Sequence, residues 1–195
     1  EKGMSISIFS LTEFLDELTK ELSLDQFHLL GNSMGGHIAL LYALNHPEKI
    51  TSLILSGSSG LYESGMGDTF PKRSDYNYIK TKTELTFYDP KIASKELVDE
   101  IFAVVNSRKV IQILSLAKST IHHNLEKELL NIKTDCCLIW GKNDKVTPPE
   151  VAIKFKKLIP HSKLYWIDQC GHVPMLETPA AFNTVLDEFL LSLRK

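Results

Sequence analysis

Four apolar runs of strand length alternate with amphipathic helical patterns along this chain. The runs are Phe27 to Leu30, Ile50 to Ser56, Cys136 to Trp140 and Lys163 to Ile167. Runs in which most consecutive residues are apolar, rather than every second residue, are typical of strands buried on both faces. Strands that alternate with helices build a mostly parallel sheet with flanking helices. The pattern therefore predicts an α/β fold.

Four helices are expected around these strands. The first should begin at Leu11, because Ser10 and Glu13 form a capping box before it. Its apolar face would consist of Leu11, Phe14, Leu15, Leu18 and Leu22. The others are expected over 37–45, after Pro148-Pro149, and after Thr178 with Pro179 in the first turn. Their apolar faces would cover the sheet.

The segment 58–131 interrupts the alternation, because it carries helical patterns and no clear strand. It predicts a small helical cap inserted between two parts of the core, residues 1–57 and 132–195. The two helical stripes of this cap are Leu97, Ile101, Val104 and Val105, and Val110, Ile111, Leu114 and Ala117. The aromatic residues available to line an apolar pocket beneath it are Phe70, Tyr76, Tyr78, Phe87 and Tyr88.

Composition excludes several classes of partner. The formal charge of −2 comes from scattered residues, so no basic stripe indicates nucleic acid. No apolar run approaches the roughly 20 residues that span a bilayer, and no signal-peptide pattern opens the chain. Three cysteines do not make a disulfide framework. We therefore expect a cytoplasmic protein without membrane contact that acts on a small molecule.

The segment Gly31-Asn32-Ser33-Met34-Gly35 matches the pattern G-x-S-x-G. An apolar strand ends just before it, and a helix with small residues begins just after it. A serine nucleophile held in a tight strand-to-helix turn requires such neighbours. Ser33 is therefore the predicted nucleophile, and the Met34 backbone N–H is expected to donate to an oxyanion. The alternative is a glycine-rich turn in which Ser33 only caps the helix.

A serine hydroxyl needs a base that takes its proton, and His172 is the predicted base. It follows the strand 163–167, which places it at the same carboxyl edge of the sheet as Ser33. Asp144 follows the strand 136–140 at that edge and is expected to orient the imidazole. The alternative acid is Asp168, which also ends a strand but lies only four residues before His172.

Other reactive residue types have simpler interpretations. Solvated or core roles are expected for His28, His46 and His161, and a metal site at His122-His123 lacks a companion carboxylate or cysteine. No metal is therefore predicted. Cys170 is expected to be a small buried residue, with a reactive thiol as the alternative.

With these residues in place, the chain resembles the α/β-hydrolase superfamily over nearly its whole length. The motifs that carry the resemblance are G-N-S-M-G-G from Gly31, H-P-E-K-I from His46, W-G-K-N-D-K-V-T-P from Trp140 and G-H-V-P-M-L-E-T-P from Gly171. The triad order Ser33, Asp144, His172 is the superfamily's order. The resemblance implies a serine hydrolase without a cofactor that forms an acyl-enzyme.

Within the superfamily, the chain looks similar to hydrolases that cleave carbon–carbon bonds in ring-opened aromatic catabolites. The similar motifs are Asn32 beside the nucleophile, Ser107-Arg108-Lys109 on a cap helix and Cys170-Gly171-His172. By that resemblance, Asn32 would polarise a substrate carbonyl and Arg108 would bind a substrate carboxylate. A turn-stabilising asparagine and a solvated arginine are the alternatives.

One departure shapes the prediction of function. The carbon–carbon hydrolases usually carry tryptophan directly after the catalytic histidine, at a substrate-binding position that Val173 occupies here. A hydrolase of small carboxylic esters is therefore predicted. A carbon–carbon bond hydrolase of vinylogous diketo acids is one alternative. A ligand-binding receptor with slow or no turnover is the other.

A second departure concerns the start of the chain. Superfamily members normally carry about four more strands and a His-Gly-type oxyanion loop before the nucleophile, whereas one helix precedes it here. We therefore expect a truncated or cleaved chain from which the first strands are absent, with the missing N-terminal segment either a separate chain or outside the structure. Without those strands, the Phe27 strand would expose an apolar edge.

Overall fold

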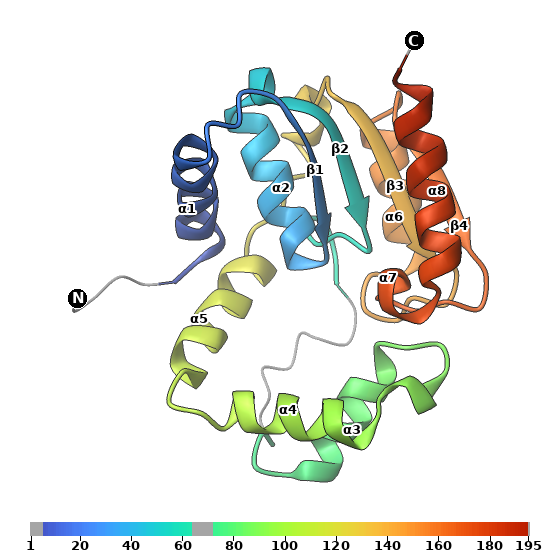
Figure 1. The fold of residues 1–195 in the computed structure, drawn as a ribbon. Coiled ribbons are helices and arrows are strands. Elements are labelled where there is room, and N and C mark those ends of the chain that lie inside the picture. Colours follow the sequence, from blue (N-terminus) through green and yellow to red (C-terminus); the bar gives the residue numbers. More distant parts are fainter. Residues whose placement is uncertain (1–5, 64–71, 195) are drawn as a thin grey trace.

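The computed structural model describes residues 6–63 and 72–194, and four parallel strands form its sheet. The strands are β1 (Phe27–Asn32), β2 (Ile50–Ser56), β3 (Asp135–Gly141) and β4 (Lys163–Ile167), hydrogen-bonded in the order β1-β2-β3-β4. The predicted α/β class and parallel sheet are confirmed. Because every strand runs the same way, all four carboxyl ends lie at one edge of the sheet (Figure 1).

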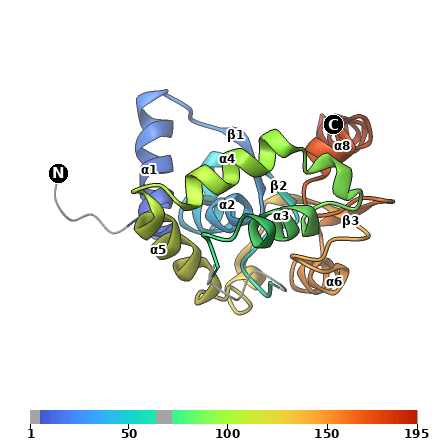
Figure 2. The same ribbon diagram turned by 90° about the horizontal axis from the view of Figure 1, so that it is seen from below.

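Helices cover both faces of the sheet (Figure 2). On one face, α2 (Met34–Asn45) and α6 (Pro149–Leu158) pack on a core that includes Leu53 and Leu55 of β2. On the other face, α8 (Pro179–Ser192) packs on a second core that includes Ile54. Neighbouring residues of β2 thus point to opposite cores, as the pleat requires. The short α7 (Pro174–Glu177) precedes α8.

The cap lies between β2 and β3 in the chain and faces the carboxyl ends of the strands (Figure 1). Its helices are α3 (Tyr76–Leu85), α4 (Lys95–Val105) and α5 (Val110–Ile121). Short 3-10 turns are η1 (Pro47–Lys49), η2 (Pro90–Ile92) and η3 (Leu129–Asn131). No helix in the described part of the chain has the length and apolar character needed to cross a membrane.

The first helix differs from the prediction. Helix α1 (Ile8–Glu21) begins three residues before Leu11, because Ser7 and Ser10 form the capping box: each side-chain oxygen accepts from the other's backbone N–H. The helix packs on α2, and its buried residues are Ile8, Thr12 and Thr19. The predicted apolar face is therefore wrong in part, since Phe14, Leu18 and Leu22 are exposed.

Two further expectations of burial are wrong. Strand β1 is an edge strand in the described sheet, as expected, but it is not a buried strand: its side chains alternate between half-buried and exposed positions, and Leu30 is exposed. In the cap, Val104 and Ile111 are exposed although each belongs to a predicted stripe. An apolar stripe shows which residues share a face, but a neighbouring element decides whether that face is covered.

Candidate active site

Ser33 lies in the turn between β1 and α2 with φ 52° and ψ −122°. A positive φ is strained for a residue with a Cβ, and here the surrounding backbone holds it in place. The Ser33 N–H donates to the Ser56 carbonyl (3.0 Å), and the Ser33 carbonyl accepts from the Ser59 N–H (3.0 Å). The turn can close because Gly31 has no side chain: a Cβ there would stand 2.3 Å from the Gly35 carbonyl oxygen.

His172 and Asp144 come together at the ends of β4 and β3. His172 Nδ1 lies 2.9 Å from Asp144 Oδ2, and both residues are buried. The backbone N–H groups of Val146 and Thr147 donate to Asp144 Oδ1, and the Thr147 hydroxyl donates to Oδ2. These donors fix the carboxylate, which can then fix the imidazole in the tautomer that leaves Nε2 free to accept a proton.

Gly57 connects the turn of Ser33 to the Asp144–His172 pair. Ser56, the residue before it, accepts the Ser33 N–H, while a Cβ on Gly57 would lie 3.0 Å from His172 Nδ1 and 3.2 Å from Asp144 Oδ2. The ends of β1, β2, β3 and β4 therefore meet at one place. Ser33 Oγ makes no hydrogen bond to His172 within the described residues; such bonds are often long until substrate binds.

Asn32 links the turn of Ser33 to the loop 168–173 between β4 and α7, which carries His172 and is called the histidine loop below. Its side-chain nitrogen donates to the Ser56 carbonyl (2.9 Å) and to the His172 carbonyl (3.1 Å). Both N–H groups of the amide are thereby used, so the predicted donation to a substrate carbonyl has no free N–H in this arrangement. The side chain still borders the Ser33 cavity. The hydrogen bonds of Asn32 therefore hold the end of β2 and the histidine loop together.

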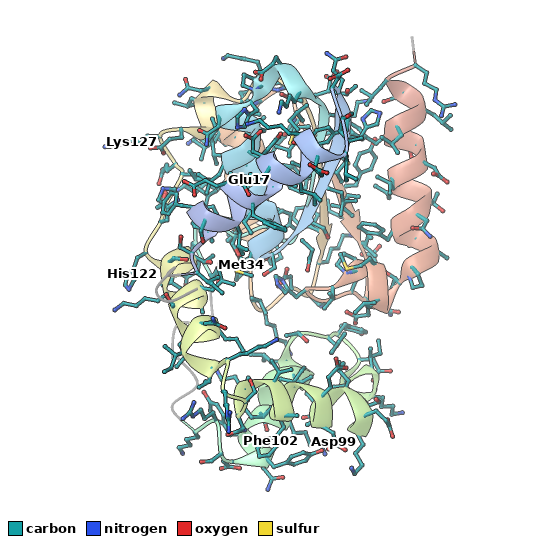
Figure 3. The ribbon with its side chains drawn as sticks, turned by 60° about the vertical axis from the view of Figure 1, so that its left-hand side comes forward. Glu17, Met34, Asp99, Phe102, His122 and Lys127 are labelled. Carbon is teal, nitrogen blue, oxygen red and sulfur yellow. The ribbon has the colours of Figure 1, made fainter. Side chains whose placement is uncertain are left out.

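A cavity of about 380 Å³ opens beside Ser33 and is bordered by α5 of the cap. Its lining is mostly apolar, and Glu63 is its one charged residue within the described part of the chain. Figure 3 shows Met34 at the end of α2 that faces the cap. The Met34 N–H makes no hydrogen bond in the described structure, as an oxyanion donor at a helix N-terminus requires. The cavity residues are Asn32, Ser33, Met34, Gly35, Ser59, Glu63, Ile113, Leu114, Leu116, Ala117, Thr120 and Ile121.

Arg108 lies in the turn between α4 and α5 rather than on a cap helix, which corrects the expectation. The Ser107 carbonyl accepts from the Val110 N–H, and the Ser107 hydroxyl accepts from the Lys109 N–H, so a turn closes before α5 begins. Arg108 is exposed and does not border the Ser33 cavity. Its binding of a substrate carboxylate remains a prediction.

Val173 and Phe87 border an apolar cavity between cap and core that is separate from the Ser33 cavity. Val173 packs against Phe87, Ala93 and Val98, and the cavity has a volume of about 250 Å³. The four aromatic residues that the structure describes do not border the Ser33 cavity, which is lined by aliphatic side chains of α5 instead; they are Tyr76, Tyr78, Phe87 and Tyr88. Phe70 lies outside the described residues.

The alternative residues make other contacts. Asp168 is exposed and forms an ion pair with Lys142 (2.6 Å). His123 lies 2.9 Å from His37, the ring nitrogens facing each other, and no cluster of metal-ligand residues occurs in the described part of the chain. Burial raises the pKa of the Cys170 thiol to about 11, so this group stays protonated near neutral pH. A low-pKa reactive thiol is therefore not what the structure shows.

The sequence patterns did not indicate two residues that shape the site, or a buried histidine close to it. Thr147 orients Asp144, Gly57 leaves room for His172, and His37 is fully buried one helical turn after Ser33. Burial, with His123 beside it, lowers the pKa of His37 to about 4. The T-P pair after Asp144 and the glycine just past a buried strand were available as signals. Nothing in the sequence marked His37.

The sequence of the chain is similar to that of known proteins. A sequence model described as alpha/beta hydrolase fold matches residues 3–82 and 78–179. A hydrolase of Pseudomonas putida named for 2-hydroxy-6-oxononadienedioate and 2-hydroxy-6-oxononatrienedioate is 27% identical over 90% of this chain and 67% of its own length. An enzyme of that name from Escherichia coli is 28% identical over 90% and 66%. The chain thus spans about two thirds of the length of these relatives.

Solved structures are also similar. An alpha/beta hydrolase enzyme from the metagenome of sediments of the Mar Chica lagoon, Morocco, is 40% identical with a TM-score of 0.75, over 97% of this chain and 74% of that one. A meta-cleavage product hydrolase from Pseudomonas fluorescens is 18% identical with a TM-score of 0.84, over 98% and 74%. The second likeness shows the fold alone.

Proposed function

Because the chain belongs to the α/β-hydrolase family, we propose that it acts as a cofactor-independent serine hydrolase of carboxylic esters. The observation that carries the proposal is the buried Asp144–His172 pair, which meets the turn of Ser33 at the carboxyl edge of the sheet. A carboxylate, an imidazole and a strained serine are the groups that acyl transfer through a serine needs.

In the proposed reaction, His172 Nε2 takes the proton of the Ser33 hydroxyl as Oγ bonds to the ester carbonyl carbon. The Met34 N–H and the N-terminus of α2 stabilise the negative oxygen that results. His172 then gives its proton to the leaving alcohol, and the acyl group stays on Ser33. Water, deprotonated by His172, breaks the acyl bond and regenerates the serine.

The lining of the cavity favours a substrate with a neutral, apolar acyl group. The described lining has aliphatic side chains from α5, no lysine or arginine, and the carboxyl group of Glu63. Burying a substrate carboxylate without a cationic partner is costly, and a neighbouring carboxylate adds repulsion. The names of the relatives favour a second candidate, hydrolysis of a carbon–carbon bond in a diketo acid.

The proposal is tested by turnover of p-nitrophenyl esters with acyl chains of two to ten carbons and of a 6-oxo-dienoate, all by the full-length protein. We expect preference for medium chains and a loss of about 10⁴-fold or more in kcat with Ser33→Ala. Exposed Ser74 supplies the control, Ser74→Ala, which should behave as wild type.

Three results would count against the ester proposal. Ester turnover that survives Ser33→Ala would exclude Ser33 as nucleophile. Faster cleavage of the 6-oxo-dienoate than of any ester would favour the second candidate. Ligand binding that persists in Ser33→Ala, with no turnover of either substrate class by the wild type, would favour a receptor.

A further inference from the structure

The Glu177 carboxylate, at the end of α7, accepts three backbone N–H groups from two different parts of the molecule. Oε2 accepts from Gly171 (2.7 Å), the residue directly before His172. Oε1 accepts from Tyr88 (2.6 Å) and Asp89 (3.2 Å), in the cap loop after α3. One side chain therefore holds the histidine loop and the cap together.

A direct backbone contact lies beside this carboxylate. The His172 N–H donates to the carbonyl of Thr86, the C-cap residue of α3 (2.8 Å). At Gly171 the histidine loop and the cap segment approach so closely that a Cβ on Gly171 would stand 2.6 Å from the Thr86 oxygen and 2.9 Å from the Tyr88 nitrogen. The cap segment 86–89 therefore contacts the backbone of both Gly171 and His172. It forms a short bridge between the cap and the loop that carries His172.

The loop that carries His172 is hydrogen-bonded to that bridge. The imidazole of His172 is fixed from one side by Asp144, but the loop that carries it is anchored to the cap through Thr86 and Glu177. Charge-assisted hydrogen bonds to a carboxylate are the stronger kind, and their direction fixes the donors in place. A cap that shifts as substrate enters would carry the histidine loop with it.

We propose that Glu177 is a positioning residue that couples the cap to His172, so that the location of the cap sets the alignment of the base with Ser33. This inference rests on the proposed function, in which His172 is the base. A glutamate that only stabilises a loop is the competing interpretation. The two differ because only the first makes the His172 environment depend on Glu177.

The test uses Glu177→Gln in the full-length protein, since the amide keeps the shape but presents an N–H₂ group to backbone donors. We expect kcat for esters to fall about tenfold or more with KM little changed, as small misplacements of a catalytic group do. Glu150→Gln is the matched control: Glu150 is exposed in the first turn of α6 and makes no hydrogen bond in the described structure.

A second readout is independent of ester turnover. We expect the downfield NMR signal of the proton between His172 Nδ1 and Asp144 to shift or broaden in Glu177→Gln. Amide exchange should also accelerate together at Gly171, Tyr88 and Asp89. If Glu177→Gln does not fold, Glu177→Asp, which keeps the charge but shortens the reach, is measured in the same way.

The outcomes separate the two proposals. A lower melting temperature with unchanged kcat and an unchanged His172 signal would overturn the coupling. Exchange that accelerates at Gly171 while Tyr88 and Asp89 stay protected would also overturn it. A wild type that does not hydrolyse esters would remove the proposed function, and the NMR and exchange data would still decide whether Glu177 couples the cap to His172.

Discussion

Each oxygen of the Asp144 carboxylate accepts two hydrogen bonds. Oδ1 receives the backbone N–H groups of Val146 and Thr147, and Oδ2 receives the Thr147 hydroxyl and His172 Nδ1. A buried carboxylate with this many donors cannot rotate without losing one of them. At the scale of single residues, Thr147 therefore controls the direction in which Asp144 faces the imidazole.

Replacing Thr147 by Val tests this control. The substitution keeps the shape of the side chain and removes its hydroxyl, so Asp144 keeps its backbone donors but loses one bond to Oδ2. We expect kcat/KM for esters to fall about tenfold, which corresponds to about 1.4 kcal/mol of transition-state stabilisation. The measurement is steady-state kinetics of the purified variant.

The matched control is Thr51→Val. Thr51 is exposed near the start of β2, at the opposite end of the sheet from the site. Equal kinetics for wild type and Thr51→Val are expected. Equal kinetics for wild type and Thr147→Val would mean that the backbone donors alone orient the acid.

At the scale of elements, the connection from β1 to α2 depends on the close approach of two backbone segments, one at Gly31 and the other at Gly35 and Gly36. A Cβ on Gly31 would stand 2.3 Å from the Gly35 carbonyl oxygen and 2.6 Å from the Gly36 nitrogen, whereas a Cβ on Gly35 would meet nothing within 4 Å. The two glycines of this motif therefore stand at their positions for different physical reasons. The first is required by packing, and the second borders the cavity without a steric need for glycine.

The pair Gly31→Ala and Gly35→Ala separates these reasons. Gly31→Ala forces a methyl group against backbone atoms that cannot move aside. It should lower the free energy of unfolding by about 3 kcal/mol or more, or prevent folding. Gly35→Ala should leave stability unchanged or raise it slightly, because alanine favours the helix. Urea denaturation measures both, and similar stabilities for the two variants would contradict the packing argument.

Much of the fold was predictable from local patterns. Strand β3 contains an uninterrupted apolar run, Cys136 to Trp140, and β2 is buried at every position except Thr51, so a short apolar run of strand length was enough to predict both. Helix α3 was not predicted, because only Ile79 and Thr83 are buried and no apolar stripe results. The exposed face of α1 was misjudged for the opposite reason: a stripe exists, but no described element covers it.

The candidate site was predictable where one residue type at a strand end carries the chemistry. Ser33, Asp144 and His172 each follow a recognisable strand. The contacts of Glu177 and Asn32 join segments far apart in sequence, and no local pattern contains that information. Arg108 and Val173 were assigned by resemblance alone, and the structure places both outside the Ser33 cavity.

At the scale of the whole molecule, the described part of the cap contacts the core at several places, which include the hydrogen bond of the Ile8 N–H to Ser119 of α5. Two of these contacts involve histidines. One is the bridge of Glu177 at the histidine loop. The other is the stacked pair of His37, on α2, and His123, just after α5. His37 is fully buried, and its Nδ1 has no hydrogen-bond partner in the described structure. Protonation of His37 would therefore place an uncompensated charge beside another histidine.

The pH dependence of stability follows from His37. Its pKa in the folded protein, about 4, lies below the ordinary value of 6.5, so the unfolded chain binds more protons between these values. Stability is then highest above pH 6.5 and falls as the pH falls toward 4. We expect the protein to lose about 2 kcal/mol between pH 6.5 and 4.5 from this group.

His37→Gln removes the titration and should flatten that part of the profile. His122→Gln, at an exposed histidine beside His123, is the control and should follow the wild type. Urea denaturation at a series of pH values gives the comparison. A wild-type slope that persists in His37→Gln would assign the acid sensitivity to other groups.

The most direct test of Ser33 as the nucleophile and His172 as its base is covalent labelling of the full-length protein with a fluorophosphonate, followed by peptide mass spectrometry. We expect a phosphonyl adduct on Ser33, none at that position in Ser33→Ala, and labelling about 10³-fold slower in His172→Gln. An unlabelled Ser33 in the folded wild type, or a labelling rate that His172→Gln leaves unchanged, would contradict these roles.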